Sequence, residues 1–287
     1  MRDGRRLSYA EFGSIHGPVV LWMHGTPGAR RQIPPSLREF ALAHGIRVIG
    51  VDRPGIGSST PHLYANVLDW AGDLELLMDT LGIETACIAG LSGGGPYALA
   101  AAVGLPGRIR RVGVMGGVAP TVGPDAAEGG LIQIAAHLAP LLRPAIRPIG
   151  FVLSNAIKVL RPVGGGVLDL YALFQPDGDK RLLADPHFKA MFLDDLVRGA
   201  RFQATAPLAD LLLFTRDWGF RLADVKVPVH WWHGDDDHIV PMRHGEHCAA
   251  LLPDATFTIA EGESHLGGLA VSPEVVTQLV GIALEAD

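Results

Sequence analysis

Short apolar segments alternate with amphipathic ones along the first part of this chain. The apolar runs, bounded by Gly, Pro and Asp, predict strands at residues 7–12, 19–23, 47–51, 85–89 and 111–115. Apolar residues at helical spacing predict helices at 35–44 and 69–81, and a further helix that ends near residue 104. This alternation predicts an α/β fold with a mostly parallel central sheet and helices on both faces. A Gly- and Pro-containing turn separates the first two strands, so we expect them to form a hairpin-like pair.

The pattern changes between residues 119 and 213, where prolines interrupt helix-like segments and no strand alternation is visible. Apolar residues at helical spacing there are Ile132, Ala135, Leu138 and Leu142, and then Phe188, Met191, Phe192 and Leu196. The sheet pattern resumes with predicted strands at 227–233 and 256–260 and helices at 242–251 and 273–284. We therefore expect a core of residues 1–118 and 214–287, and a helical cap insertion of residues 119–213 that closes a pocket. A second independent domain is the alternative, but the many prolines make an autonomous core unfavourable.

A serine lies between glycines where a predicted strand meets a predicted helix. Gly90 and Gly94 flank Ser92, after the apolar run 85–89 and before an Ala- and Leu-rich segment. A turn this tight forces the serine toward strained backbone angles, and glycines beside it remove clashes between strand and helix. The hydroxyl then stands at a helix N-terminus, where backbone N–H groups favour negative charge. The pattern predicts a nucleophile elbow, and a glycine-rich helix start without chemistry is the alternative.

The chain also supplies a candidate base and acid for this serine. A serine hydroxyl is a weak nucleophile near neutral pH, so Ser92 needs a general base and a third group that orients the base. His265 follows the last predicted strand, and Asp235, Asp236 and Asp237 follow the strand before it. The order Ser, Asp, His is the one expected with a nucleophile elbow. At this point any of the three aspartates could be the acid.

A loop after the second strand is a candidate oxyanion hole. This strand runs into His24-Gly25-Thr26-Pro27-Gly28, which is too rich in Gly and Pro for regular structure. Because Pro27 has no N–H, the donor nearest the strand end is that of Thr26. An ordinary strand-end loop is the alternative interpretation.

Together these motifs resemble the α/β-hydrolase fold superfamily, over residues 7–119 and from about residue 213 to the end, but not in the cap. In similar proteins the acid lies four residues before the proline of an Asp-x-x-x-Pro turn, which selects Asp237. The resemblance thus implies a catalytic triad of Ser92, Asp237 and His265. It also implies that the N–H of Gly93 is the second oxyanion donor, beside that of Thr26.

The resemblance further implies a structural loop at residues 52–58. Its glycines suggest backbone bends at the carboxyl edge of the sheet. We interpret Asp52 and Arg53 in this loop as structural ion partners and not as catalysts.

Charge and composition narrow the kind of partner. The net charge is -6 with both signs interspersed, which indicates no nucleic-acid surface and no polybasic membrane anchor. We expect no transmembrane helix and no signal peptide, hence no stable membrane insertion and a cytoplasmic location.

Cys87 and Cys248 are expected to be reduced. His238, His244 and His247 are candidate metal ligands, but the chain has no His-Glu-x-x-His, so we expect no metal and no organic cofactor.

These observations predict a serine hydrolase that cleaves carboxylic esters of small to medium hydrophobic substrates through an acyl-enzyme intermediate. The apolar cap favours a hydrophobic small-molecule substrate, and a homo-oligomer is left open. Serine at position 92 counts against epoxide hydrolases and haloalkane dehalogenases, which use an aspartate nucleophile.

Several alternatives stay open. The His-Gly-x-Pro-Gly loop resembles that of proline iminopeptidases, and such an aminopeptidase needs cap carboxylates to hold the substrate amine. The candidates are Asp125, Glu128, Asp169, Asp194 and Asp195. A carbon–carbon bond hydrolase shares the serine triad. A ligand-binding protein on a hydrolase scaffold is the alternative that is not an enzyme.

Overall fold

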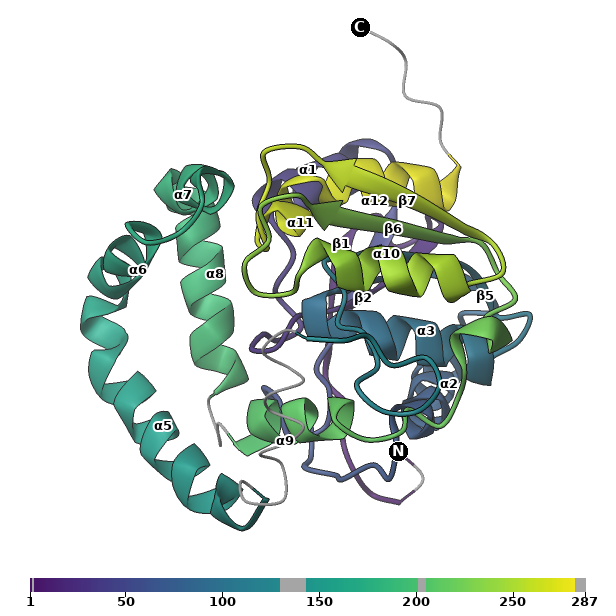
Figure 1. Ribbon diagram of the computed structural model, residues 1–287, viewed down its shortest axis with the longest axis horizontal. Helices are drawn as coiled ribbons and strands as arrows, with labels where there is room; N and C mark the ends of the chain where they lie inside the picture. Colours follow the sequence, from purple (N-terminus) through teal and green to yellow (C-terminus); the bar gives the residue numbers. More distant parts are fainter. Residues whose placement is uncertain (2, 130–142, 201–204, 282–287) are drawn as a thin grey trace, which may run out of the picture.

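A seven-stranded sheet forms the centre of the computed structural model, which describes residues 1, 3–129, 143–200 and 205–281. The strand order is β1-β3-β2-β4-β5-β6-β7, and only β1 runs antiparallel to its neighbour (Figure 1). The strands are β1 Tyr9–Gly13, β2 Val19–Met23, β3 Arg47–Val51, β4 Ala86–Leu91, β5 Ile109–Met115, β6 Val229–Gly234 and β7 Ala255–Ala260. The predicted α/β class with a mostly parallel sheet is confirmed.

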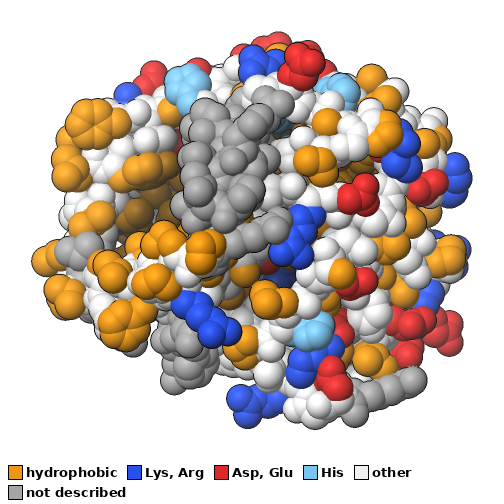
Figure 2. All heavy atoms as spheres, turned by 60° about the horizontal axis from the view of Figure 1, so that its bottom comes forward, with side chains coloured by type: hydrophobic (Ala, Val, Ile, Leu, Met, Phe, Trp, Pro, Cys, Tyr) orange, Lys and Arg blue, Asp and Glu red, His pale blue; other side chains and the backbone are white. Residues whose placement is uncertain are grey.

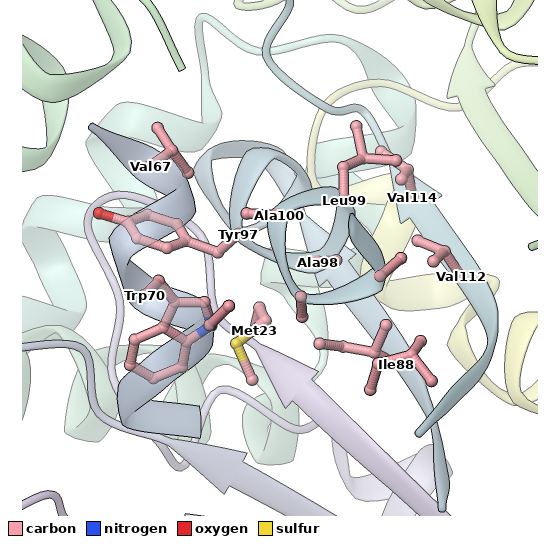
Figure 3. Close-up of a cluster of buried hydrophobic side chains, with 14 of the residues drawn as sticks. Met23, Val67, Trp70, Ile88, Tyr97, Ala98, Leu99, Ala100, Val112 and Val114 are labelled. Carbon is pink, nitrogen blue, oxygen red and sulfur yellow. The ribbon is translucent and has the colours of Figure 1, made fainter. Parts of the chain in front are cut away.

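Helices cover both faces of the sheet. On one face α1 and α12 pack against the strands, and on the other face α3 and α10 do so, with α2 against α3 (Figure 1). Their bounds are α1 Pro35–Ala43, α2 Trp70–Thr80, α3 Gly95–Gly104, α10 Met242–Leu251 and α12 Ser272–Val280. Successive strand side chains point to opposite faces, so Leu21 and Met23 enter one buried cluster while Val20 and Trp22 enter the other. Figure 3 shows the cluster between the sheet, α2 and α3.

The first two strands do not form the expected hairpin-like pair, and that prediction is wrong. β1 pairs antiparallel with β3, and β2 lies on the other side of β3. The connection between them crosses the start of β3, where Ser14 N–H donates to the Ile46 carbonyl and Arg47 N–H donates to the Pro18 carbonyl. A Cβ on Gly17 would lie 1.5 Å from the Gly45 carbonyl oxygen, so this close crossing requires a glycine.

The described residues between β5 and β6 contain helices and no strand. These are α5 Ile146–Leu160, α6 Gly164–Ala172, α7 Asp177–Ala184, α8 Pro186–Gly199 and α9 Thr205–Phe214, which we call the helical insertion. In Figure 1, α5 to α8 form an arc to the left of the sheet, and α9 lies beneath the core. The domain boundaries at 118/119 and 213/214 stay a prediction. The series from Ile132 to Leu142 lies outside the described residues, as do the last predicted helical residues, 282–284.

One short helix has not yet been placed. The short helix α11, Gly267–Ala270, follows β7 and leads into α12. None of the helices in the described ranges has the length and apolar character needed to cross a membrane.

Candidate active site

Ser92 follows β4 at a sharp turn into α3. Its φ angle is +51°, and it is the one non-glycine residue with positive φ in the described ranges. A Cβ on Gly90 would lie 2.5 Å from the Gly94 carbonyl oxygen, and a Cβ on Gly94 would lie 2.2 Å from the Met23 carbonyl oxygen. Side chains at these positions would therefore push β4, β2 and α3 apart. The local structure is the elbow that the glycine spacing predicts.

The strained angle at Ser92 predicts a stability difference between two variants that both lack the hydroxyl. A left-handed backbone costs an L residue about 1 kcal/mol, whereas glycine adopts it without this cost. We expect Ser92→Gly to unfold about 2 °C higher than Ser92→Ala. Differential scanning calorimetry of the two proteins checks this, and equal melting temperatures would contradict a strained elbow.

His265 and Asp237 come together from the loops after β7 and β6. The Nδ1 atom of His265 lies 2.7 Å from Oδ2 of Asp237, and both side chains are buried. Asp237 Oδ1 accepts hydrogen bonds from the backbone N–H groups of Ile239 and Val240, at 2.8 and 2.9 Å. The carboxylate is thus held at one oxygen and presents the other to the imidazole. This arrangement can orient a histidine base and stabilise its cation.

The two competing aspartates are engaged elsewhere. Asp235 accepts a hydrogen bond from the Gly262 N–H, and Asp236 lies 2.9 Å from His238 at the surface. Burial by itself raises the pKa of Asp237, but hydrogen bonds from His233 and His265 outweigh it and hold that pKa below its ordinary value. Among the three aspartates, Asp237 is the one that the structure pairs with His265.

His233 also contacts the carboxylate of Asp237. Its Nδ1 accepts a hydrogen bond from the Trp231 indole at 3.3 Å, so its Nε2 carries the proton. That Nε2–H donates to the Val240 carbonyl at 2.8 Å and lies 3.3 Å from Oδ2 of Asp237. His233 is therefore a hydrogen-bonded supporting group near the end of β6.

Thr26 and Gly93 lie side by side next to the elbow. A Cβ on Gly93 would lie only 2.5 Å from the Thr26 hydroxyl oxygen and 3.0 Å from the Phe214 ring. The predicted oxyanion loop and the residue after Ser92 are thus in direct contact. Two backbone N–H donors from these positions can face one developing oxyanion.

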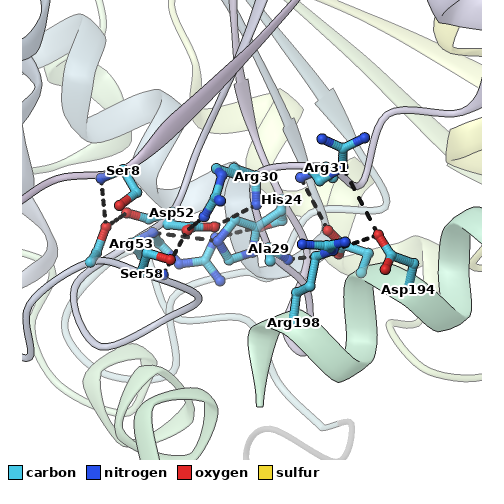
Figure 4. Close-up of polar contacts among 12 residues, drawn as sticks. Ser8, His24, Ala29, Arg30, Arg31, Asp52, Arg53, Ser58, Asp194 and Arg198 are labelled. Carbon is cyan, nitrogen blue, oxygen red and sulfur yellow. Dashed lines mark hydrogen bonds and ion pairs between the residues drawn. The ribbon is translucent and has the colours of Figure 1, made fainter. Parts of the chain in front are cut away.

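Arg53 holds the oxyanion loop from beneath, which the sequence analysis does not foresee. Its buried guanidinium donates to the carbonyls of His24 and Gly25, to the hydroxyl of Thr26 at 2.7 Å, and to the carboxylate of Asp210 at 2.8 Å. Figure 4 shows Arg53 beside His24. Because an arginine presents several donors in a fixed plane, one side chain can fix three successive loop residues.

The loop residues Asp52 and Arg53 are ion partners, as predicted. Asp52 pairs with the guanidinium of Arg30 and accepts the Ser58 N–H at 3.1 Å (Figure 4). Arg53 pairs with Asp210. Burial raises the pKa of the Asp52 carboxyl even though these donors oppose the effect.

His24 is not a competing base. Burial, together with the Arg53 charge, holds the pKa of its imidazole well below the ordinary value. Its Nδ1 lies 2.7 Å from the Gly25 carbonyl and therefore donates to it. The ring is a neutral structural group.

Ser92 and the His265–Asp237 pair both contact the segment that follows β5. A Cβ on Gly116, just after β5, would lie 3.5 Å from His265 Nδ1 and 3.4 Å from Asp237 Oδ2, and the Val118 N–H donates to the Ser92 carbonyl. No hydrogen bond joins the side chains of Ser92 and His265, both of which are described. A bond of this kind in a catalytic site is often long without substrate.

Two of the three candidate metal-binding histidines, His244 and His247, instead lie against backbone carbonyls. His244 Nε2 lies 3.1 Å from the Glu128 carbonyl, and His247 Nε2 lies 3.0 Å from the Asp125 carbonyl. Over residues 1, 3–129, 143–200 and 205–281, no three Cys, His, Asp or Glu side chains gather as metal ligands do. Cys87 and Cys248 are free and buried.

An apolar cavity of about 400 Å³ connects the oxyanion loop to the helical insertion. Thr26 and Pro27 line it from the core, and the remaining lining residues are Leu153, Ile157, Gly164, Val167, Leu168, Leu193, Leu196, Val197, Ala200, Pro207, Leu208 and Leu211. None of these lining residues is charged. Figure 2 shows hydrophobic side chains around a hollow on the side of the arc of helices. Ser92 is not among the lining residues, but the lining residue Thr26 contacts Gly93 of the elbow.

A larger groove, of about 800 Å³, lies on another side of α9. Its lining includes Arg6, His62 and Arg147 but none of the predicted catalytic or oxyanion residues. We therefore take the apolar cavity as the candidate substrate site.

The alpha/beta hydrolase fold family model matches residues 18–269. The chain belongs to the α/β-hydrolase family. A non-heme chloroperoxidase of Streptomyces lividans is 30% identical over 96% of this chain and 94% of its own length. A 2-hydroxy-6-oxononadienedioate/2-hydroxy-6-oxononatrienedioate hydrolase of Paraburkholderia phymatum is 30% identical over 88% of this α/β hydrolase and 82% of its own length.

Two other relatives match only partly. The dihydrolipoyllysine-residue acetyltransferase component of the acetoin cleaving system of Cupriavidus necator is 30% identical over 92% of this α/β hydrolase, which spans only 63% of that relative. A proline iminopeptidase of Xylella fastidiosa is 36% identical, but over 34% of the chain. These relatives carry different activities on one fold, so the substrate has to be argued from the site.

Proposed function

We propose that this α/β hydrolase is a serine esterase for hydrophobic carboxylic esters. The observation that carries the proposal is the uncharged cavity that leads from the helical insertion to Thr26, beside the elbow of Ser92. A cavity of this lining favours an apolar acyl or alcohol group, because burying apolar surface is favourable and charge burial is not.

The proposed reaction follows from the geometry. Ser92 attacks the ester carbonyl while His265 takes its proton, and the N–H groups of Thr26 and Gly93 bind the oxyanion. Asp237 keeps the His265 proton on Nδ1, so that Nε2 is free to accept the serine proton. His265 then protonates the leaving alcohol, and water activated by the same imidazole releases the acid.

The peptidase and carbon–carbon hydrolase alternatives are less well supported by the site. Of the cap carboxylates that could hold a substrate amine, Asp125, Asp169 and Asp194 pair with Arg221, Lys189 and Arg198. Asp195 accepts two backbone N–H groups. The carbon–carbon hydrolase relative is named for a dioate, whereas no cationic side chain lines the described cavity.

An activated fluorophosphonate tests the nucleophile. We expect brief exposure to give one stoichiometric adduct on Ser92, located by peptide mass spectrometry. The adduct is absent in Ser92→Ala and forms at least about a hundredfold more slowly in His265→Ala, since the base is lost. Folded wild-type protein that gives no adduct would overturn the proposal in favour of ligand binding without turnover.

The acyl-chain preference tests the cavity. For p-nitrophenyl esters we expect kcat/KM to rise about tenfold for each two methylenes until the cavity is filled. Leu168→Ala, which removes cavity lining, should lower kcat/KM for the best ester about tenfold and leave the acetate nearly unchanged. Leu170→Ala on the same helix is the control, because Leu170 is exposed and does not line the cavity. A flat chain-length profile would contradict the assignment.

A further inference from the structure

Three buried aspartates of the helical insertion contact the loops that carry the candidate catalytic groups. Asp179 lies on α7, Asp195 on α8 and Asp210 on α9, and all three are buried. Burying a carboxylate is unfavourable unless hydrogen bonds satisfy its oxygens. The donors that each carboxylate has found therefore identify what it holds in place.

Asp179 holds the loop of His265. Its Oδ1 accepts hydrogen bonds from the Ser264 hydroxyl and from the Leu266 N–H, the latter at 2.9 Å. These donors flank His265 in the chain on both sides. A Cβ on the neighbouring Gly178 would lie 3.1 Å from the Ser264 nitrogen, so α7 packs directly on this loop.

Asp195 of α8 holds the segment that directly follows the oxyanion loop. Its Oδ2 accepts the Ala29 N–H at 2.7 Å and its Oδ1 accepts the Arg31 N–H at 3.1 Å. A Cβ on Gly199 of the same helix would lie 2.9 Å from the Gly28 carbonyl oxygen. Figure 4 shows the contact of this helix with Ala29 and Arg31.

Asp210 acts on the same loop through an arginine. Its Oδ2 accepts from Arg53, which in turn donates to the hydroxyl of Thr26, and its Oδ1 accepts from the Tyr97 hydroxyl at 2.8 Å. Tyr97 lies on α3, one turn after Ser92. The Arg53 guanidinium also stacks on the Tyr97 ring, 4.8 Å from its centroid.

A stabilising ion pair does not account for two of these residues. Both carboxylates are buried, so they have lost the water that would otherwise solvate their charge. No Lys, Arg or His nitrogen of the described chain compensates this loss by forming an ion pair with Asp179 or Asp195. Their partners are neutral donors of two particular loops. Such contacts hold those loops against α7 and α8.

We propose that Asp179, Asp195 and Asp210 are positioning residues, through which the helical insertion sets the His265 loop and the oxyanion loop in their reactive arrangement. The proposal rests on the proposed serine hydrolase function. The insertion is then a structural part of the catalytic site as well as one wall of the substrate cavity.

Variants of Asp179 test whether this residue positions the His265 loop. Both bonds use one oxygen, so the amide oxygen of Asp179→Asn can replace it, whereas Asp179→Leu cannot accept. We expect Asp179→Leu to lower kcat and the fluorophosphonate labelling rate about a hundredfold with KM within twofold, and Asp179→Asn to retain most of both. Asp177→Leu is the matched control on α7, because Asp177 is exposed and its ion pair within the described residues is with the neighbouring Lys180.

A spectroscopic readout separates this proposal from the proposed function. The proton between His265 Nδ1 and Asp237 gives a downfield ¹H NMR signal that does not depend on turnover. We expect the signal to shift or disappear in Asp179→Leu and to stay in Asp179→Asn. If the wild-type protein shows no labelling, the esterase proposal fails, while this signal still tests the positioning of His265.

Asp195→Asn tests whether Asp195 positions the oxyanion loop. Its amide nitrogen would face a backbone N–H in place of an acceptor, so we expect labelling about tenfold slower with the His265 signal unchanged. Near-UV circular dichroism checks that each variant is folded. If Asp179→Leu does not fold, Ser264→Ala replaces it, with a severalfold loss of labelling rate expected. Folded variants with wild-type labelling rates and an unchanged His265 signal would overturn the proposal.

Discussion

Replacing Asp237 by Asn should lower kcat for ester hydrolysis about ten-thousandfold while the protein stays folded. The amide oxygen can keep the bonds from the Ile239 and Val240 N–H groups, so the amide nitrogen faces His265. It then donates to Nδ1 and leaves the imidazole proton on Nε2, where the ring cannot accept the proton of Ser92. Steady-state kinetics with a chromogenic ester and the rate of fluorophosphonate labelling measure the loss.

The neighbouring aspartate is the control for this substitution. Asp236 is exposed and pairs with His238 at the surface, so Asp236→Asn should keep kcat within about twofold. Equal losses in the two variants would indicate disruption of the loop and not of the triad. A loss in Asp236→Asn alone would move the acid to the other carboxylate.

The second large effect is on stability, at Gly94. A Cβ there would lie 2.2 Å from the Met23 carbonyl oxygen and 2.8 Å from that of His24, and neither backbone group can move without shifting β2. We expect Gly94→Ala to lower the free energy of unfolding by about 3 kcal/mol or more, with a loss of labelling even in the folded fraction. Urea unfolding followed by tryptophan fluorescence measures it.

Gly72 provides the matched control for that alanine. It lies inside α2, and a Cβ on it meets no atom within 4 Å. Alanine is a better helix former than glycine, so Gly72→Ala should raise the free energy of unfolding by about 0.5–1 kcal/mol. Opposite signs for the two substitutions are the expected result, and a harmless Gly94→Ala would contradict the close packing at the elbow.

Local sequence patterns predict the parallel strands and the flanking helices well, because each buried face imposes its period on the sequence. They misplace β1, whose partner is decided by where a glycine-containing connection crosses β3. Periodicity carries no information about that crossing. The contact between Gly17 and Gly45 becomes visible only in three dimensions.

In the candidate site, the sequence predicts the catalytic residues but not the contacts that support them. Ser92, Asp237 and His265 each follow a strand of a parallel sheet, so topology brings their loops to one edge. The supporting contacts join residues far apart in the chain, such as Arg53 with Asp210 and Ala29 with Asp195. The sequence around an aspartate in a helical segment does not show whether the side chain holds a loop, pairs with a surface lysine or binds a substrate amine. Sequence alone therefore lists Asp195 as an amine ligand and does not single out Asp210.

The position of the helical insertion between β5 and β6 has a consequence for biosynthesis. In the folded sheet β5 pairs with β4 on one side and with β6 on the other. Because β6 begins at Val229, it is synthesised only after the whole insertion. At ribosomal rates this interval is on the order of ten seconds. During this interval the outer edge of β5 presents unpaired backbone N–H and C=O groups, which are a template for pairing with another chain. Fragments that end within the insertion should therefore aggregate, and chaperone binding during synthesis should be strongest over this stretch.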